Sequence, residues 1–205
     1  MIQEFIASIS VLLIAVILHE CAHGWVAYRL GDPTAKLAGR LTLNPLKHID
    51  PIGSILLPLV LRLMHFYPFG WAKPVPVNFA SLNNPKRDMV LVALAGPAVN
   101  FMLAVFLSLV LKLNLPIAIE ELVVLAILIN LILAIFNLIP IPPLDGSRLV
   151  MGLLPNSLAI LYSRLERYGI IIVLVMLNLG YLDFIWPLAA HLAQELGAET
   201  SLLGV

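Results

Sequence analysis

Two histidines and a glutamate follow directly on an apolar run that is long enough to enter a membrane. The run from Phe5 to Leu18 carries no charge, and His19, Glu20 and His23 come next in the pattern HECAH. Positions i and i+4 of a helix share a face, so both imidazoles can point at one metal ion. Glu20 can then reach a water molecule at that ion as a general base. Since ionisable side chains cost several kcal/mol at membrane depth, this group indicates function.

The composition is typical of a polytopic membrane protein. Of 205 residues, 61% are hydrophobic and 12% are charged, and the mean hydropathy is +1.01, which is too apolar for a soluble domain. The formal net charge is zero, so nothing indicates nucleic-acid binding. The one cysteine, Cys21, excludes an intrachain disulfide. Because it is two residues from His19, Cys21 points to roughly the opposite side of a helix and is not expected to bind the metal.

Four runs are long enough to cross the bilayer. The first, from Phe5 to Tyr28, would form a helix of roughly 36 Å. It has neither a basic leader nor a small-residue cleavage site, so we expect a retained span and not a signal peptide. The other three runs are Met89 to Leu111, Leu122 to Ile139 and Tyr168 to Ala190. Together these runs predict an all-α bundle of four to six transmembrane helices.

The segment from Pro51 to Trp71 is too interrupted for a simple span. Its uncharged part ends at Leu61 and is followed by Arg62 and His65, which favours a re-entrant or interfacial element. If the segment dips in and returns, the basic clusters on either side of it face one compartment, the cytoplasm. Those clusters comprise Arg29, Lys36, Arg40, Lys47, Lys73, Lys86, Arg87, Arg148, Arg164 and Arg167, and only Lys112 falls on the other side. This topology predicts a multi-pass protein of the cell membrane with its N-terminus outside and its active site toward the cytoplasm.

The segment from Lys73 to Phe79 is predicted to be extended. Pro74 and Pro76 each restrict the preceding residue to β or polyproline geometry. Because prolines also lack an N–H donor, this segment could only form an edge strand. We expect it to lie near the active site, where an unwound substrate could pair with it.

A second group of chemically informative residues ends the run from Leu122. Three prolines between Asn137 and Gly146 end any helix, and Gly146 permits a sharp turn beside Asp145. Irregular backbone at this depth is tolerated only inside protein or beside a wet cavity. Asp145 is therefore our candidate third metal ligand, which leaves zinc a fourth position for water. The alternatives are that Asp145 only caps a turn, or that Glu166 is the third ligand in place of Asp145.

These motifs together resemble the site-2 protease family of intramembrane zinc metalloproteases. The matching segments are HECAH at 19–23, AGPAVN at 95–100, NLIPIPPLDG at 137–146, GRLTLNPL at 39–46 and HIDPIG at 48–53. The resemblance covers most of residues 1–152 and fits the compact members that lack PDZ and CBS domains. It implies one zinc ion per chain on His19, His23 and Asp145, with Glu20 activating the water. It also implies that Asn100 and Asn137 bind substrate.

The function that this resemblance implies is intramembrane proteolysis. The expected substrate is a transmembrane protein or peptide in the lipid bilayer, cut in or near its transmembrane segment during regulated intramembrane proteolysis. The chain is expected to form one domain, residues 1–205, with a catalytic core of about 1–152 and a C-terminal span of about 163–192. Two alternatives stay open: a metal-ion or solute transporter that uses the His/Asp cluster as its path, and an inactive zinc-binding scaffold. Asn130, which has no motif around it, is assigned to an interhelical hydrogen bond.

Overall fold

All regular secondary structure is helical in the part of the chain that the structure describes. The computed structural model describes residues 2–66, 70–113 and 115–203, with side chains from residue 6 onward, and no strand occurs among them. The longer helices are α1 (Ile2–Arg29), α4 (Pro85–Val110), α5 (Ile117–Asn137), α6 (Asp145–Leu153), α8 (Gly169–Asn178) and α9 (Ile185–Glu195). The shorter ones are α2 (Thr34–Leu37), η1 (Pro45–Lys47), η2 (Pro51–Leu56), α3 (Leu57–Leu63), η3 (Phe79–Ser81), α7 (Asn156–Ser163), η4 (Arg164–Tyr168) and η5 (Thr200–Leu203). The predicted all-α fold is confirmed.

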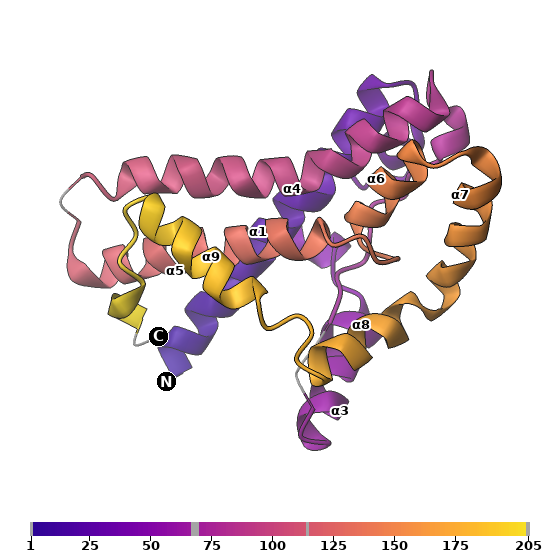
Figure 1. Ribbon diagram of the computed structural model, residues 1–205. Helices are drawn as coiled ribbons and strands as arrows, with labels where there is room; N and C mark the ends of the chain where they lie inside the picture. The colour runs from indigo at the N-terminus through magenta and orange to yellow at the C-terminus, as the bar shows by residue number, and fades with distance from the viewer. Residues whose placement is uncertain (1, 67–69, 114, 204–205) are drawn as a thin grey trace.

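Three helices of the described chain are long and apolar enough to cross a membrane, namely α1, α4 and α5. Helices α4 and α5 lie antiparallel, and α1 packs obliquely against both (Figure 1). Helix α4 begins where the sequence provides a start signal. Pro85 occupies its first turn, and the Asp88 carboxylate accepts a 2.8 Å hydrogen bond from the backbone N–H of Asn84. These three helices correspond to the first three predicted spans.

The core of the bundle lies between α5 and α9. Ile127, Leu128 and Leu131 of α5 are at most 1% exposed, and they share one apolar cluster with Ala189 and Ala193 of α9. Small side chains on α9 let the two helices approach closely, as is common where helices pack inside a membrane. Helix α9 therefore belongs to the bundle although it is short.

The predicted C-terminal span, Tyr168 to Ala190, is wrong as one continuous helix. Helix α8 ends at Asn178 and α9 begins at Ile185. Gly180 between them adopts a φ of +77°, a left-handed conformation that glycine accepts and other residues resist. The turn breaks the apolar run into two pieces of 10 and 11 residues, each too short to cross alone. The expected count of four to six transmembrane helices is therefore not confirmed.

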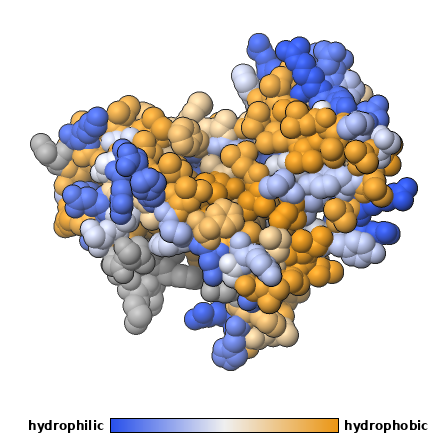
Figure 2. All heavy atoms as spheres, viewed as in Figure 1, coloured by the Kyte–Doolittle hydropathy of each residue, from blue (hydrophilic) through white to orange (hydrophobic). Residues whose placement is uncertain are grey.

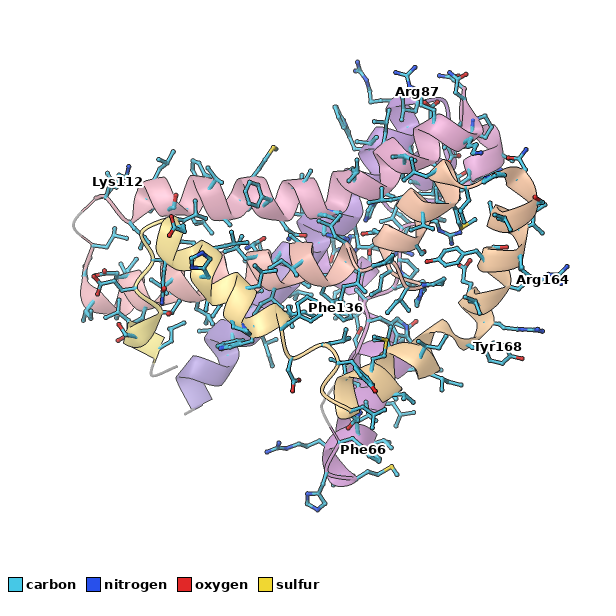
Figure 3. All side chains as sticks on the ribbon, in the orientation of Figure 1. Phe66, Arg87, Lys112, Phe136, Arg164 and Tyr168 are labelled. Atoms are coloured by element: carbon cyan, nitrogen blue, oxygen red, sulfur yellow. The ribbon has the colours of Figure 1, made fainter. Side chains whose placement is uncertain are left out.

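The outer surface of the bundle is apolar. Met102 and Phe106 of α4 are 62% and 61% exposed, and apolar side chains cover most of the face shown in Figure 2. Charged residues lie toward the ends. Arg87 and Lys112 occupy opposite ends of α4, and Arg164 lies toward the end that carries Arg87 (Figure 3). This distribution is that of helices surrounded by lipid.

The segment from Pro51 to Trp71 leaves the fold and returns to it. Its helical part, η2 followed by α3, ends at Leu63 and is roughly 20 Å long, against a hydrocarbon thickness of about 30 Å. The backbone N–H of Trp71 then donates to Gly53 O (3.1 Å), and Lys73 N–H donates to His48 O (2.8 Å). The two ends of the segment are thus adjacent, as expected of a re-entrant or interfacial element. Residues 67–69 lie outside the described part of the chain.

Candidate metal centre

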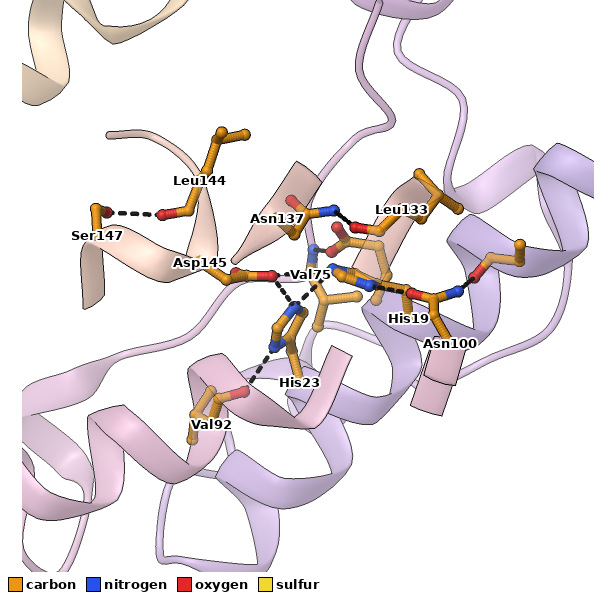
Figure 4. Close-up of polar contacts among 12 residues, drawn as sticks. His19, His23, Val75, Val92, Asn100, Leu133, Asn137, Leu144, Asp145 and Ser147 are labelled. Atoms are coloured by element: carbon orange, nitrogen blue, oxygen red, sulfur yellow. Dashed lines mark hydrogen bonds and ion pairs between the residues drawn. The ribbon is translucent and has the colours of Figure 1, made fainter. Parts of the chain in front are cut away.

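Three side chains from distant parts of the sequence converge beside α1. His19 and His23 are 6% and 8% exposed, and Asp145 reaches them from the start of α6 (Figure 4). The Nε2 atoms of the two histidines are 3.0 Å apart, and each lies 3.1 Å from Oδ2 of Asp145. Neighbouring ligand atoms of a tetrahedral zinc site stand about 3.3 Å apart when each is about 2.0–2.1 Å from the ion. One zinc ion therefore fits this group after a shift of a few tenths of an ångström.

The hydrogen bonds behind the two imidazoles determine which nitrogen carries the proton. Nδ1 of His23 lies 2.7 Å from the carbonyl oxygen of Val92, which can only accept, so this Nδ1 is the protonated one. Nδ1 of His19 donates to Oδ1 of Asn100 at 2.6 Å. In the neutral imidazoles, both Nε2 lone pairs then face the Asp145 carboxylate with no proton between them. Three acceptors that face one another repel, and a cation at their centre removes that repulsion.

Two glycines make room for this arrangement. A Cβ on Gly96 of α4 would lie 2.4 Å from Nε2 of His23 and 2.5 Å from Nε2 of His19, so only glycine lets α4 pass so close to the rings. A Cβ on Gly146 would lie 2.2 Å from the carbonyl oxygen of Leu138. Gly146 thus lets α6 begin tightly against the end of α5, which carries Asp145 to the histidines.

The Glu20 carboxylate is held by a segment that we call the strap, residues 70–78. The backbone N–H of Val75 donates a 2.7 Å hydrogen bond to Oε2 of Glu20. Two residues before Val75, the carbonyl of Lys73 accepts a 2.8 Å hydrogen bond from Nη2 of Arg40, and the N–H of Lys73 donates to His48 O. Two residues before Lys73, the N–H of Trp71 donates to Gly53 O, which lies near the start of the hairpin formed by residues 51–71. Residues 71, 73 and 75 are therefore anchored along one edge, as in an extended chain.

These groups surround one cavity of about 610 Å³. Its wall is formed by the three candidate ligands, by Glu20, by strap residues from 70 to 77, and by side chains from the ends of α5 and α6. The strap contributes mainly apolar side chains, among them Trp71, Val75 and Val77. The arrangement combines a cation site, a carboxylate base and an apolar wall beside an extended backbone.

Comparison with known proteins identifies the family. The sequence model of peptidase family M50 matches residues 114–180. The Bacillus subtilis (strain 168) protein named "Putative zinc metalloprotease YwhC" is 39% identical over 190 residues, 88% of this chain and 80% of that protein. The chain belongs to peptidase family M50. "Putative zinc metalloprotease Rip2" of Mycolicibacterium smegmatis is 34% identical over 184 residues, covering 84% of this chain and 67% of its own length. No solved structure matches the chain.

M50 peptidases are intramembrane zinc proteases, so this chain is a zinc metalloprotease and a membrane protein, and the resemblance seen in the sequence is confirmed. Membership decides against the transporter and against the scaffold that binds zinc without activity. Among the described residues, one group of three possible ligands is close enough to share an ion, and it consists of His19, His23 and Asp145. Glu166, the alternative third ligand, lies on the cavity wall and pairs instead with Arg148 at 2.6 Å.

The two asparagines expected to bind substrate occupy different positions in this M50 peptidase. Asn137 lines the cavity, and its Nδ2 donates to Leu133 O at 3.0 Å. Asn100 is 0% exposed and lies behind His19, away from the cavity wall. Sequence reasoning missed the contact of Val75 with Glu20, because a backbone N–H leaves no trace in residue patterns. The interhelical hydrogen bond expected of Asn130 is present, because its Oδ1 on α5 accepts from Nδ2 of Asn100 on α4 at 2.8 Å.

Proposed function

We propose that the chain cleaves peptide bonds in or near the transmembrane segments of membrane-protein substrates, in regulated intramembrane proteolysis. In this proposal His19, His23 and Asp145 hold the zinc ion, and Glu20 is the general base. The observation that carries the proposal is the convergence of three possible ligand atoms, Nε2 of His19, Nε2 of His23 and Oδ2 of Asp145, on the wall of the cavity that also contains Glu20. This group adjoins α1, which is long and apolar enough to cross a membrane.

The chemistry divides between the ion and the side chains. A bound zinc ion supplies Lewis acidity and makes a water molecule acidic near neutral pH. Glu20 takes a proton from the attacking water and passes it to the leaving amine. Its Oε2 is engaged by Val75 N–H, which orients the carboxylate and leaves Oε1 for proton transfer. Asn137 on the cavity wall is placed to hydrogen-bond the substrate backbone.

The substrate must present an extended backbone, because a helix hides its carbonyl groups in its own hydrogen bonds. The strap is the part of the wall to which such a backbone can pair. Residues 71, 73 and 75 already form hydrogen bonds to the rest of the protein along one edge of the strap. A substrate backbone would therefore pair along the opposite edge, at Ala72, Pro74 and Pro76. The two prolines offer carbonyl acceptors and no N–H donors. A paired substrate would therefore contribute most of the donors.

The distribution of charge supports a sidedness for this site. Lys112 lies at the end of α4 opposite Arg87, and Arg164 lies toward the end with Arg87 (Figure 3). Since basic residues concentrate on the cytoplasmic side, the active site would face the cytoplasm in the cell membrane. Residues 1–205 would form one domain. All proposed catalytic, metal-binding and substrate-binding residues lie within about residues 1–152, and α9 at the C-terminus packs on α5.

The substitution Glu20→Gln separates proteolysis from metal binding. The amide keeps nearly the same shape and can still accept a hydrogen bond from Val75 N–H, so zinc should stay near one ion per chain. It cannot take up or deliver the proton, and cleavage of a reconstituted transmembrane peptide should fall by about 10²–10⁴-fold. Glu195→Gln, an exposed carboxylate on α9, is the matched control and should cleave normally. Cleavage at the wild-type rate by zinc-loaded Glu20→Gln protein would rule out the proposed mechanism.

A further inference from the structure

Two asparagines form a line of hydrogen bonds that connects α5 to the metal centre on α1. Nδ2 of Asn130 donates to Ala126 O at 2.8 Å, and Oδ1 of Asn130 accepts from Nδ2 of Asn100, also at 2.8 Å. Oδ1 of Asn100 then accepts from Nδ1 of His19 at 2.6 Å. Asn100 and Asn130 are 0% and 4% exposed, so water does not compete for these bonds.

The direction of every bond in this line is determined at its far end. Ala126 O is a backbone carbonyl and can only accept, so Asn130 must turn its NH₂ toward it and its oxygen toward Asn100. Asn100 must in turn present its NH₂ to that oxygen. Ala15 O, 3.3 Å from Nδ2 of Asn100, favours the same orientation more weakly. The oxygen of Asn100 is thereby left facing His19.

The consequence concerns the tautomer of His19. With the Asn100 oxygen opposite Nδ1, the proton of the neutral ring stays on Nδ1 and the lone pair stays on Nε2, facing His23 and Asp145. A flipped Asn100 amide would place its NH₂ against Nδ1. The ring would then favour the tautomer with the proton on Nε2, which cannot bind a metal there.

We propose that Asn130 is a positioning residue of the metal centre. It holds the Asn100 amide in the one orientation that keeps Nε2 of His19 free for zinc, and it acts through Asn100 without touching the ion. The inference deepens the proposed function, since it takes His19 as a zinc ligand. It adds a role in metal affinity to the interhelical hydrogen bond that the sequence predicts and that Asn130 makes with Asn100.

The test is the zinc affinity of the purified full-length chain in detergent, measured by competition with a fluorescent zinc chelator. Asn130→Leu keeps the branched shape of the side chain, with two methyl groups in place of the amide oxygen and nitrogen, and removes both of its hydrogen bonds. It should weaken zinc binding by about 10- to 100-fold, the usual effect of losing a group that orients a metal ligand. Ser108→Ala, which removes another buried polar group from the same bundle, should leave the zinc affinity unchanged. Asn130→Ala provides the same test if the leucine variant does not fold.

A double-mutant cycle with Asn100→Leu distinguishes positioning from packing. If Asn130 acts through Asn100, its replacement should cause no further loss of zinc affinity in the Asn100→Leu background. A purely structural role would instead change the thermal stability of the metal-free protein and leave zinc affinity alone. Unchanged affinity in Asn130→Leu, or the full loss persisting in the Asn100→Leu background, would overturn the proposal. Because the readout is metal affinity, this failure is separate from a failure of proteolysis, which Glu20→Gln tests.

Discussion

The backbone N–H of Val75 donates a 2.7 Å hydrogen bond to the carboxylate of Glu20, so the strap and the proposed base are joined directly. A hydrogen bond to a charged group contributes roughly 1.5–3 kcal/mol. The contact therefore fixes the orientation of Glu20 within the cavity. It also means that any movement of the strap on substrate binding reaches the base.

Replacing Val75 by proline should slow cleavage without removing zinc. Proline suits the extended strap but has no N–H, so Glu20 loses the bond that orients it, and misplacement of a base by about 1 Å costs up to about 100-fold in rate. Val75→Ala keeps the N–H and adds no polar group to this buried position, so it should retain far more activity than Val75→Pro. Val77→Pro is a positional control, since no hydrogen bond of its N–H is described. Equal rates for Val75→Pro and Val77→Pro would show that the bond to Glu20 has no role in turnover.

A methyl group on residue 96 should damage the metal centre more than any other change of its size on α4. Gly96→Ala places Cβ 2.4–2.5 Å from the Nε2 atoms of both histidines, and rigid rings held by Val92 and Asn100 cannot rotate away. We expect at least a tenfold loss of zinc affinity, about the effect of disturbing the groups that orient ligands. Leu94→Ala, at a partly exposed position of the same helix, should bind zinc normally. Wild-type affinity in Gly96→Ala would show that the rings sit elsewhere when zinc is bound.

The third ligand can be identified by metal content. Asp145→Ala removes one of three proposed ligands, and two histidines alone hold zinc poorly, so purified protein should lose most of its zinc, as His23→Ala should. Glu166→Ala breaks only the ion pair with Arg148 and should retain about one ion per chain. Mass spectrometry of the native protein measures both. Full zinc occupancy in Asp145→Ala would show that this aspartate caps the turn before α6 and does not bind the metal.

The sequence predicted which residues meet at the candidate metal centre better than it predicted the helices around them. HECAH is a local pattern on one helix, and the prolines before Asp145 mark an irregular segment, so both halves of the site are visible as residue types. The break at Gly180 was missed because the turn lies inside an apolar run, and the mean hydropathy of that run stays high across it. The interhelical hydrogen bond of Asn130 was predicted, but its connection through Asn100 to His19 was not. That connection depends on which of two similar amide atoms faces a neighbour on another helix, and spacing along the chain carries no such information.

The hairpin at residues 51–71 leads to a prediction about topology. Because His48 and Lys73 are hydrogen-bonded, the chain before the hairpin and the chain after it must lie on the same side of a membrane. With Cys21 replaced by alanine, single cysteines introduced as Lys36→Cys and Arg87→Cys should react with an impermeant maleimide only after the cells are opened. Lys112→Cys, at the other end of α4, should react in intact cells (Figure 3). All three native side chains are exposed, so access within the protein does not limit labelling. Opposite labelling of positions 36 and 87 would mean that the hairpin crosses the bilayer, and the cytoplasmic placement of the active site would then lose its support.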